Sequence, residues 1–394
     1  MKILTFTSLY PNNEQASHGV FVENRLRQLQ RHHPDVECKV VAPVPWFPSQ
    51  NPVFGRYACL ARVNGFEKRH GIDIWHPRFP VLPKIGMTLA PWLMYQSTRR
   101  CVRRLWDTGF DFDVIDAHYF YPDGVAAMWL AEEFERPFVV TGRGTDLTLI
   151  PQYRLPRHMI RDTARKAAHV ITVAAALKSR LGALGIPDEH VMVLRNGVDL
   201  DFFRPAKDRR DLRNRLGYGA RPTLLSAGHL IERKGHHLVI EALRAVKGVA
   251  LLIAGDGPEE RMLRKLVKQY SLQDRVRFLG RLSQENLREH YQAADILVLA
   301  SSREGWANVL LEAMACGTPA VATPVDGTPE VITEPAAGIL TSDRSATAIS
   351  SAIAALRAGL PDRADTRRYA ERFSWEETAR GQYELLSRVI SRWK

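Results

Sequence analysis

Short apolar runs alternate with longer amphipathic segments over the first 200 residues. Each short run is rich in Val, Ile and Leu, which predicts a β-strand buried on both faces. The longer segments repeat apolar residues every three to four positions, which predicts helices. The predicted strands are residues 3–6, 38–41, 114–117, 138–141, 170–173 and 192–194, and the predicted helices are residues 22–31, 125–134 and 159–168. This βαβ alternation indicates a parallel sheet covered by helices on both faces.

The same alternation begins again after residue 205. The predicted strands are here residues 223–227, 250–254, 276–278, 296–300 and 320–322, and the predicted helices are residues 237–246, 259–270, 283–292, 306–316 and 345–356. The sequence therefore predicts an α/β fold of two doubly wound, Rossmann-like domains, over residues 1–198 and 205–373. We expect these domains to face a central cleft, with ligands at the carboxyl ends of the strands.

Two further segments connect and extend the predicted domains. Residues 199–222 contain Pro205, two glycines and many charges, which is typical of a hinge region. Residues 374–394 predict a long amphipathic helix, and Ser374 with Glu377 matches a capping box. We expect this C-terminal helix to pack back on the N-terminal domain.

Length and composition support two globular domains. A chain of 394 residues is long for one core, and 45% hydrophobic with 25% charged residues is ordinary for a globular protein. The four cysteines are scattered, which predicts reduced thiols in a cytosol rather than a disulfide framework or a metal site. The first residues read as a strand rather than a signal peptide, and no apolar run reaches the roughly 18 residues of a membrane span.

The net charge of +12 is shared evenly between the two halves of the chain. Nucleic-acid-binding proteins gather such an excess on one face, so the even distribution argues against a nucleic-acid partner. It suits an anionic substrate and an anionic membrane surface equally well.

Residues 304–312 carry the most specific chemistry. Gly305 allows a close backbone approach between Glu304 and a predicted helix start, where unpaired N–H groups favour phosphate. Glu312 lies about two turns further along this helix, roughly on the same face. A phosphate seat with a hydroxyl-binding carboxylate on each side suits a nucleotide sugar.

Several glycine-rich motifs accompany this segment in a fixed order. They are Asn196-Gly197-Val198-Asp199, Gly228 with Lys234-Gly235, Ala254-Gly255-Asp256-Gly257-Pro258, Phe278-Leu279-Gly280, and the turn from Gly327 to Glu330. A single glycine cluster is a weak signal, but this order and spacing together are specific. With them the chain resembles glycosyltransferase family 4 over most of its length, most strongly over residues 196–330. The resemblance implies the GT-B architecture and retaining transfer of a sugar from a UDP- or GDP-sugar, without a metal ion or other cofactor.

The resemblance assigns the segment after residue 303 to the donor. Glu304 is implied as the catalytic residue that contacts the donor sugar, and Glu312 as the residue that holds the ribose hydroxyls. The backbone N–H groups of Asn308 and Val309 are implied to meet the pyrophosphate. Trp306 either walls the sugar pocket or packs in the core.

The resemblance also assigns basic residues to the donor. Lys234 is implied to bind the diphosphate, whose charge grows as it leaves. Where the family has an arginine, this chain has His229, which is mostly neutral at pH 7. Either Arg233 neutralises the phosphate in place of the missing arginine, or activity falls as His229 deprotonates. For Arg233, the other interpretation is a surface charge without a role in binding. Arg281 matches the position that holds the nucleobase.

The N-terminal domain is implied to carry the acceptor, a glycan or a lipid-linked precursor. Gly19 lies in a loop that approaches the donor phosphate or the acceptor, and His118 matches the histidine near the reacting sugar. His118 also ends a predicted strand, where ligands of doubly wound sheets bind. Asp146 follows another strand and either binds the acceptor or orders its loop.

A stretch over residues 79–95 is unusually apolar and precedes Arg99, Arg100, Arg103 and Arg104. Such a stretch either lies on an anionic membrane surface or forms a buried helix with a solvated basic end. By resemblance to bacterial members, we expect a cytoplasmic enzyme of envelope or exopolysaccharide assembly, peripheral at the inner face of the membrane.

Two other function classes stay open at this stage. A sugar-nucleotide epimerase or hydrolase shares the architecture and breaks the same bond without an acceptor. A non-catalytic nucleotide-sugar-binding protein would retain the donor site, with His229 as a mark of decay.

The Asp111-Phe112-Asp113 segment precedes a predicted strand, and we interpret it as a turn rather than a metal-binding motif.

Overall fold

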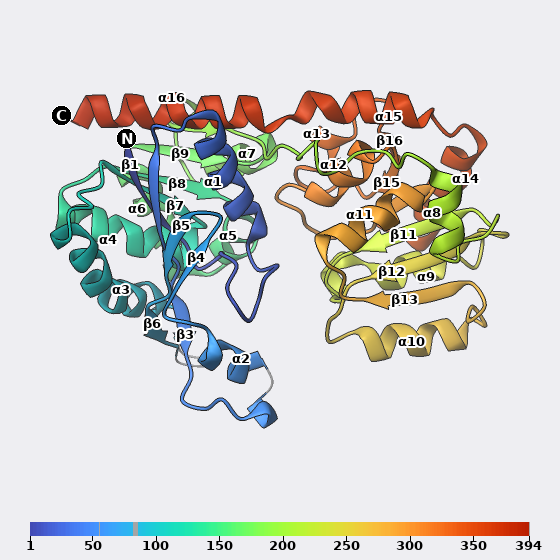
Figure 1. Ribbon diagram of the computed structural model, residues 1–394, viewed down its shortest axis with the longest axis horizontal. Helices are drawn as coiled ribbons and strands as arrows, with labels where there is room; N and C mark the ends of the chain where they lie inside the picture. Colours follow the sequence, from blue (N-terminus) through green and yellow to red (C-terminus); the bar gives the residue numbers. More distant parts are fainter. Residues whose placement is uncertain (55, 82–85, 394) are drawn as a thin grey trace. The chain divides into compact units, whose positions relative to one another are not determined.

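A computed structural model describes residues 1–54, 56–81 and 86–393, so residues 82–85 of the apolar stretch lie outside the described residues. The chain divides into two compact units. Unit 1 comprises Met1–Asn196 together with Trp375–Lys394, and unit 2 comprises Gly197–Ser374. Figure 1 labels the helices and strands of each unit.

Unit 1 is built on a sheet with the strand order β10-β9-β8-β7-β1-β2-β5-β4, and β3 and β6 form a separate two-stranded sheet. The strands are β1 (Lys2–Phe6), β2 (Glu37–Val41), β3 (Val44–Trp46), β4 (Phe66–Arg69), β5 (Ile72–Trp75), β6 (Arg78–Pro80), β7 (Val114–His118), β8 (Phe138–Gly142), β9 (His169–Thr172) and β10 (Val191–Val193). Every residue of β7 and β8 is buried, because helices cover both faces of the sheet.

The edge of this sheet differs from the prediction of a purely parallel sheet. Strand β4 pairs antiparallel with β5. His70 and Gly71 connect them with φ angles of 50° and 85°, as a two-residue hairpin turn requires. The alternation of strands and helices does not predict this hairpin, because the hairpin depends on the two-residue turn alone.

The helices of unit 1 are α1 (Val20–His32), α2 (Arg56–Arg62), α3 (Ala90–Asp107), α4 (Val125–Phe134), α5 (Thr145–Thr148), α6 (Arg154–Lys166), α7 (Ala175–Ala183) and α16 (Trp375–Trp393). Helix α16 lies beside α1 (Figure 1). Leu385, Leu386 and Val389 of α16 enter the same core as Leu26 and Leu29 of α1. Nearby, the rings of His33 and Tyr383 stack with centroids 3.9 Å apart. The C-terminal helix is therefore an integral layer of unit 1.

Unit 2 holds a parallel sheet with the order β13-β12-β11-β14-β15-β16. Its strands are β11 (Thr223–Ala227), β12 (Ala250–Ala254), β13 (Val276–Gly280), β14 (Ile296–Leu299), β15 (Ala320–Ala322) and β16 (Gly338–Leu340). Its helices are α8 (Arg209–Arg215), α9 (His236–Ala242), α10 (Glu260–Gln269), α11 (Gln284–Ala293), α12 (Asn308–Ala315), α13 (Thr328–Val331), α14 (Ala346–Ala358) and α15 (Arg363–Ala370).

Residues 199–222, predicted as a hinge region, lie within unit 2. Helix α8 sits in this segment, and its Arg209 and Arg213 each form an ion pair with Asp295, with N–O distances of 2.6 and 3.1 Å. The segment is thus fixed to the body of unit 2. Within the described part of the chain, no helix combines the length and the apolar character needed to cross a membrane.

Candidate active site

The order of strands in unit 2 reverses between β11 and β14. Ligands of doubly wound folds bind beyond the carboxyl ends of the strands at such a switch point. Lys234 follows β11 and Glu304 follows β14, and their side chains form an ion pair of 2.5 Å between Nζ and Oε1. Lys234 and Glu304 were both predicted to bind the donor. They are 70 positions apart in the chain and lie together at the switch point.

The Glu304 carboxylate is buried and held from several sides. Ser301 Oγ donates to Glu304 Oε1 at 2.6 Å, and the Glu304 backbone N–H donates to Asp326 Oδ2 at 3.1 Å. Arg233 Nη1 lies 3.8 Å from Glu304 Oε2 and donates to the Arg303 carbonyl at 2.7 Å. Arg233 therefore belongs to the same charged cluster, which disfavours its alternative as an isolated surface charge.

The backbone around this cluster leaves no room for larger residues. Gly228 and Gly255 have φ angles of 150° and 142°. A Cβ on Gly255 would lie 1.9 Å from the Gly228 carbonyl oxygen, and one on Gly257 would lie 2.4 Å from that of Leu230. The loops after β11 and β12 thus pack backbone against backbone, which explains the glycine spacing seen in the sequence. His229 in the first of these loops is exposed, and the charged cluster described above does not include its side chain.

Helix α12 begins at Asn308, two residues later than predicted, with Val309 as its second residue. Its Glu312 accepts a hydrogen bond of 3.0 Å from the Tyr291 hydroxyl, and burial raises the pKa of Glu312 to about 7. Trp306 is buried and its ring lies 6.2 Å from that of Phe373. For Trp306 this favours the packing alternative.

Arg281 lies at the end of β13 and forms an ion pair of 3.1 Å with Asp256. Both side chains are largely exposed. The pair links the loops that follow β12 and β13, so Asp256 both shapes its turn and orients Arg281.

Unit 1 has its own switch point between β1 and β7, and His118 ends β7 there. Its Nδ1 accepts a hydrogen bond of 2.7 Å from Arg143 Nη2, and its Nε2 lies 3.4 Å from Asp116 Oδ2. Burial lowers the pKa of His118 to about 4 against the raising effect of Asp116, and Arg143 lowers it further. The ring is therefore neutral at pH 7, with protein groups on both nitrogens. This arrangement suits a side chain that shapes the site better than one that shuttles a proton.

A buried polar network that the sequence reasoning missed stands behind His118. Arg25, only 1% exposed, donates to Gln382 Oε1 at 2.8 Å and to the Leu194 carbonyl at 3.1 Å. Gln382 of α16 donates in turn to Asp116 Oδ2 at 2.7 Å. The available signal was Arg25 itself, because it falls on the face of α1 that buries the apolar positions.

Asp146 is buried, and both of its carboxylate oxygens accept backbone N–H groups. These come from Phe120 at 2.9 Å, Arg143 at 3.1 Å and Gly144 at 2.7 Å. Of the two alternatives for Asp146, the bonds favour ordering the loop over binding an acceptor. Gly19 immediately precedes α1 with a φ of 66°, and a Cβ there would lie 2.2 Å from the Leu9 carbonyl.

The Asp111–Asp113 segment is committed to local structure. Lys2 Nζ donates to Asp111 Oδ1 at 2.6 Å, and the Lys2 backbone N–H donates to Asp113 Oδ2 at 2.9 Å. These carboxylates lie before β7, at the edge of the sheet opposite His118.

Comparisons with known proteins agree with this geometry. The family model described as Glycosyltransferase Family 4 matches residues 20–202, and the one described as Glycosyl transferases group 1 matches residues 208–373. A protein of Bacillus subtilis named as a teichuronic acid biosynthesis glycosyltransferase is 26% identical over 332 residues, across 83% of this chain and 82% of that protein. One of Escherichia coli named as a colanic acid biosynthesis glycosyltransferase is 32% identical over 263 residues, across 63% and 62%. The chain thus spans less than two thirds of the second relative.

Solved structures extend the likeness to the fold. The structure of Anabaena HepE in complex with UDP superposes with a TM-score of 0.73 at 20% identity, across 98% of this chain and 100% of that one. Successive family matches, one on each unit, and a full-length structural match lead to the same assignment. The chain belongs to glycosyltransferase family 4 and has the GT-B fold of two Rossmann-like domains.

Proposed function

We propose that this glycosyltransferase moves a sugar, with retention, from a UDP- or GDP-sugar to an acceptor hydroxyl without requiring a metal ion. The observation that carries the proposal is the cluster of Lys234, Arg233 and Glu304 at the β11/β14 switch point. It combines cations for a diphosphate with a carboxylate for a sugar. A glycosidase, by contrast, uses two carboxylates as acid and base and needs no such cations.

In this proposal Lys234 and Arg233 stabilise the negative charge that grows on the leaving diphosphate. The first backbone N–H groups of α12, those of Asn308 and Val309, bind the same group. A departing phosphate oxygen accepts the proton of the attacking hydroxyl on the same face of the sugar, so the step needs no protein nucleophile. Glu304 binds the transferred sugar and favours the positive charge that develops at its anomeric carbon.

The ribose is assigned to Glu312 and the base to Arg281. With a pKa of about 7, Glu312 populates both protonation states near neutral pH, and hydroxyl donors of a ribose would favour the carboxylate. His229 is exposed and outside the ion-pair cluster, so phosphate neutralisation is assigned to Lys234 and Arg233.

The acceptor is assigned to unit 1, near the buried residues His118 and Gly19, with a lipid-linked or polysaccharide precursor as the substrate. The names of the teichuronic acid and colanic acid relatives support a role in bacterial envelope or exopolysaccharide synthesis. The corresponding location is the cytoplasm, at the inner face of the membrane.

The test begins with a thermal-shift screen over nucleotides and nucleotide sugars, since a ligand that binds only the folded state raises its melting temperature. The donor found is then assayed with glycan and lipid-linked acceptors, and NMR of the product gives its anomeric configuration. Glu304→Ala should reduce turnover by about 10²-fold or more if transition-state contacts are lost. Glu384→Ala, which removes an exposed carboxylate from α16, is the matched control.

Each alternative outcome has a definite meaning. Rapid release of nucleotide from the donor without any acceptor would identify an epimerase or hydrolase. Donor binding without turnover on any acceptor would identify a non-catalytic binding protein. Inversion at the anomeric carbon, or activity of Glu304→Ala within a few-fold of wild type, would refute the proposed mechanism.

A further inference from the structure

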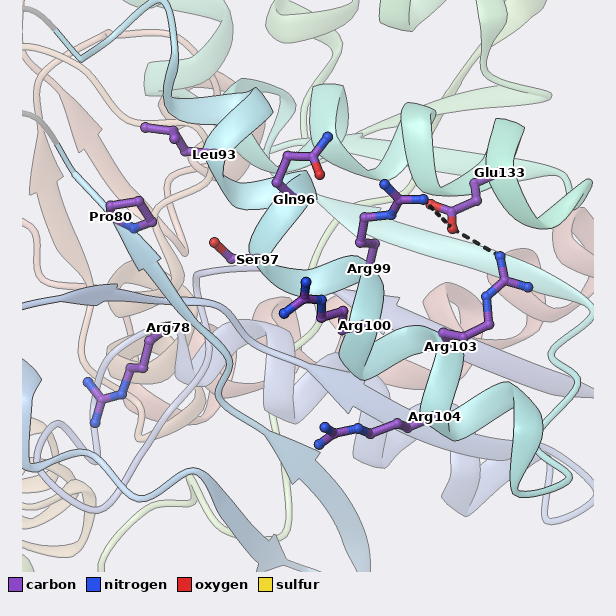
Figure 2. A pocket seen from close by; sticks show the side chains of 10 residues that line it. All are labelled: Arg78, Pro80, Leu93, Gln96, Ser97, Arg99, Arg100, Arg103, Arg104 and Glu133. Atoms are coloured by element: carbon purple, nitrogen blue, oxygen red, sulfur yellow. Dashed lines mark hydrogen bonds and ion pairs between the residues drawn. The ribbon is translucent and has the colours of Figure 1, made fainter.

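A pocket of about 870 Å³ lies in unit 1 between α3 and β6 (Figure 2). Its volume is within the range of ordinary small-molecule sites. Arginines dominate its wall, namely Arg78 of β6 and Arg99, Arg100, Arg103 and Arg104 of α3, against the single carboxylate of Glu133. The pocket is therefore strongly positive, which favours binding of an anionic ligand.

The four arginines of α3 form two pairs at helical spacing, and the pairs differ. Arg99 and Arg103 point toward α4, where their Nη2 atoms lie 3.1 and 2.9 Å from Glu133 Oε1 (Figure 2). One carboxylate thus holds two guanidinium groups in place. These two arginines are already committed to a contact within the protein.

Arg100 and Arg104 extend from the other side of α3, toward the strand that carries Arg78 (Figure 2). Neither forms an ion pair or a side-chain hydrogen bond with any residue in the described ranges 1–54, 56–81 and 86–393. Both also line an adjoining pocket of about 570 Å³. Two guanidinium groups one helical turn apart, unpaired among the described residues, thus border both pockets.

Arg78 closes the opposite wall and is held rigidly. Its guanidinium donates to the backbone carbonyls of Leu60, Ala61 and Val63. Carbonyl acceptors fix its position without neutralising its positive charge. The pocket therefore has one guanidinium fixed by hydrogen bonds, facing those of Arg100 and Arg104.

The surface around the start of α3 is apolar. Met87, Leu89 and Trp92 are exposed by 40%, 47% and 51%, and Leu93 of the same helix lines the pocket. The opposite face of α3, with Met94, Val102 and Leu105, is buried in unit 1. The helix is thus packed into the fold, as one sequence alternative expected, and yet carries an exposed apolar first turn beside its arginines.

The same helix start is tied to the segment that follows His118. The Tyr121 hydroxyl donates to the Met87 carbonyl, and Tyr121 lies in the turn between β7 and α4. This one hydrogen bond joins the segment before α3 to the segment that follows His118, in the unit assigned to the acceptor.

We propose that the pocket between α3 and β6 binds the phosphate or diphosphate group of a lipid, with Arg100 and Arg104 as its ligands. The fork of an arginine matches two phosphate oxygens, and paired arginines suit a dianion. The exposed apolar turn of α3 then contacts the hydrocarbon chain. As the subsite for a lipid-linked phosphorylated acceptor, the pocket rests on the proposed function, whereas its affinity for phosphate does not.

Binding of inorganic pyrophosphate is the first test, measured by calorimetry on the full-length protein. Lys234→Ala serves as the background in every sample, because it weakens the pyrophosphate site assigned to unit 2. Arg100→Ala/Arg104→Ala should weaken the remaining affinity by at least about tenfold, because two charge-assisted contacts are lost. Lys265→Ala/Lys268→Ala, which removes the same charge from the exposed face of α10, should leave it unchanged.

A variant with the opposite sign sharpens the test. Glu133→Gln removes the carboxylate that holds Arg99 and Arg103, which should tighten pyrophosphate binding. All four substituted positions on α3 and α10 are exposed, so unchanged melting temperatures can establish that the variants are folded. In the Lys234→Ala background, pyrophosphate binding that is equal with and without Arg100→Ala/Arg104→Ala, or reduced equally by the α10 control, would overturn the proposal.

Vesicle flotation tests the source of the phosphate. Vesicles of phosphatidylglycerol mixed with phosphatidylcholine should carry the wild type but not Arg100→Ala/Arg104→Ala, and pure phosphatidylcholine should carry neither. If the substitution abolishes pyrophosphate binding but not flotation, the lipid source is refuted. Failure of pyrophosphate to bind would leave donor turnover untouched, while absence of transfer with intact binding would refute the proposed function alone.

Discussion

Gly235 offers a sharp test of how the donor cluster is held together. It follows Lys234 directly and has a φ of 70°. A Cβ at this position would lie 2.0 Å from the carbonyl oxygen of Ala300, the residue that directly follows β14. Real Cβ atoms essentially never come closer than 3.0 Å to such an atom. In Gly235→Ala, the loop that carries residue 235 must therefore move away from Ala300 by at least the difference between 2.0 and 3.0 Å.

The size of the effect follows from two contributions. The left-handed backbone costs a non-glycine residue about 1–2 kcal/mol. Gly248 supplies the control for that contribution, because its φ is 72° and nothing lies within 4 Å of its would-be Cβ. We expect Gly248→Ala to lower the melting temperature by about 2–8 °C, at roughly 2–4 °C per kcal/mol for a domain of this size. Gly235→Ala adds the backbone clash and should lower it by clearly more.

The clash also has a functional consequence. A displacement of about 1 Å between Lys234 and Glu304 should reduce transfer by roughly 10²-fold, as misplaced catalytic groups do. Calorimetric unfolding and initial rates of the two alanine variants, measured side by side, test both statements. Equal melting temperatures for Gly235→Ala and Gly248→Ala would refute the reasoning, as would a Gly235→Ala enzyme with wild-type turnover.

Three further predictions concern single polar groups. Burial raises the pKa of Glu312 to about 7, so above the ordinary pKa of about 4.5 the native state retains a proton that the unfolded chain has released. The free energy of unfolding contributed by this group should therefore decline as pH rises from about 4.5 through 7. Over that range, the melting temperature of wild type should fall relative to that of Glu312→Gln. A difference that does not vary with pH would contradict the assignment. Gln382→Leu leaves the buried Asp116 carboxylate without its amide donor, which should cost about 1–3 kcal/mol and lower turnover by loosening the partner of His118; unchanged calorimetric unfolding would argue against the network. Asp146→Ala removes the acceptor of three backbone N–H groups, so we expect faster proteolysis of its loop with unchanged donor affinity in a thermal-shift assay, and a selective loss of donor affinity would contradict a loop-ordering role.

Much of the fold can be predicted from the sequence because its central strands are buried on both faces. β12 and β14 are continuous apolar runs, and this pattern needs no partner to be recognised. The β4–β5 hairpin was missed because it depends on a single His70–Gly71 turn at the sheet edge.

The candidate site, like the fold, could be predicted from the sequence only in part. The motifs identified Lys234 and Glu304 individually, but their ion pair joins loops 70 residues apart and depends on strand order. Arg25 gave a signal by its place on the buried face of α1, but its links to Asp116 and Gln382 were out of reach. A buried arginine and a distant glutamine have no joint signature in one sequence. The arginines of α3 appeared as one basic group, and only the position of Glu133 separates them into two pairs.

The path of the chain has a consequence for how this protein comes to be folded. Unit 2 is one uninterrupted stretch, whereas unit 1 is complete only when α16 joins residues synthesised more than 170 positions earlier. During translation, the second unit in the chain can thus finish folding before the first. Until α16 emerges, the core cluster that contains Leu26 and Leu29 lacks Leu385, Leu386 and Val389, and the Asp116 carboxylate lacks its glutamine donor. Completion of unit 1 around His118 therefore follows the synthesis of all of unit 2.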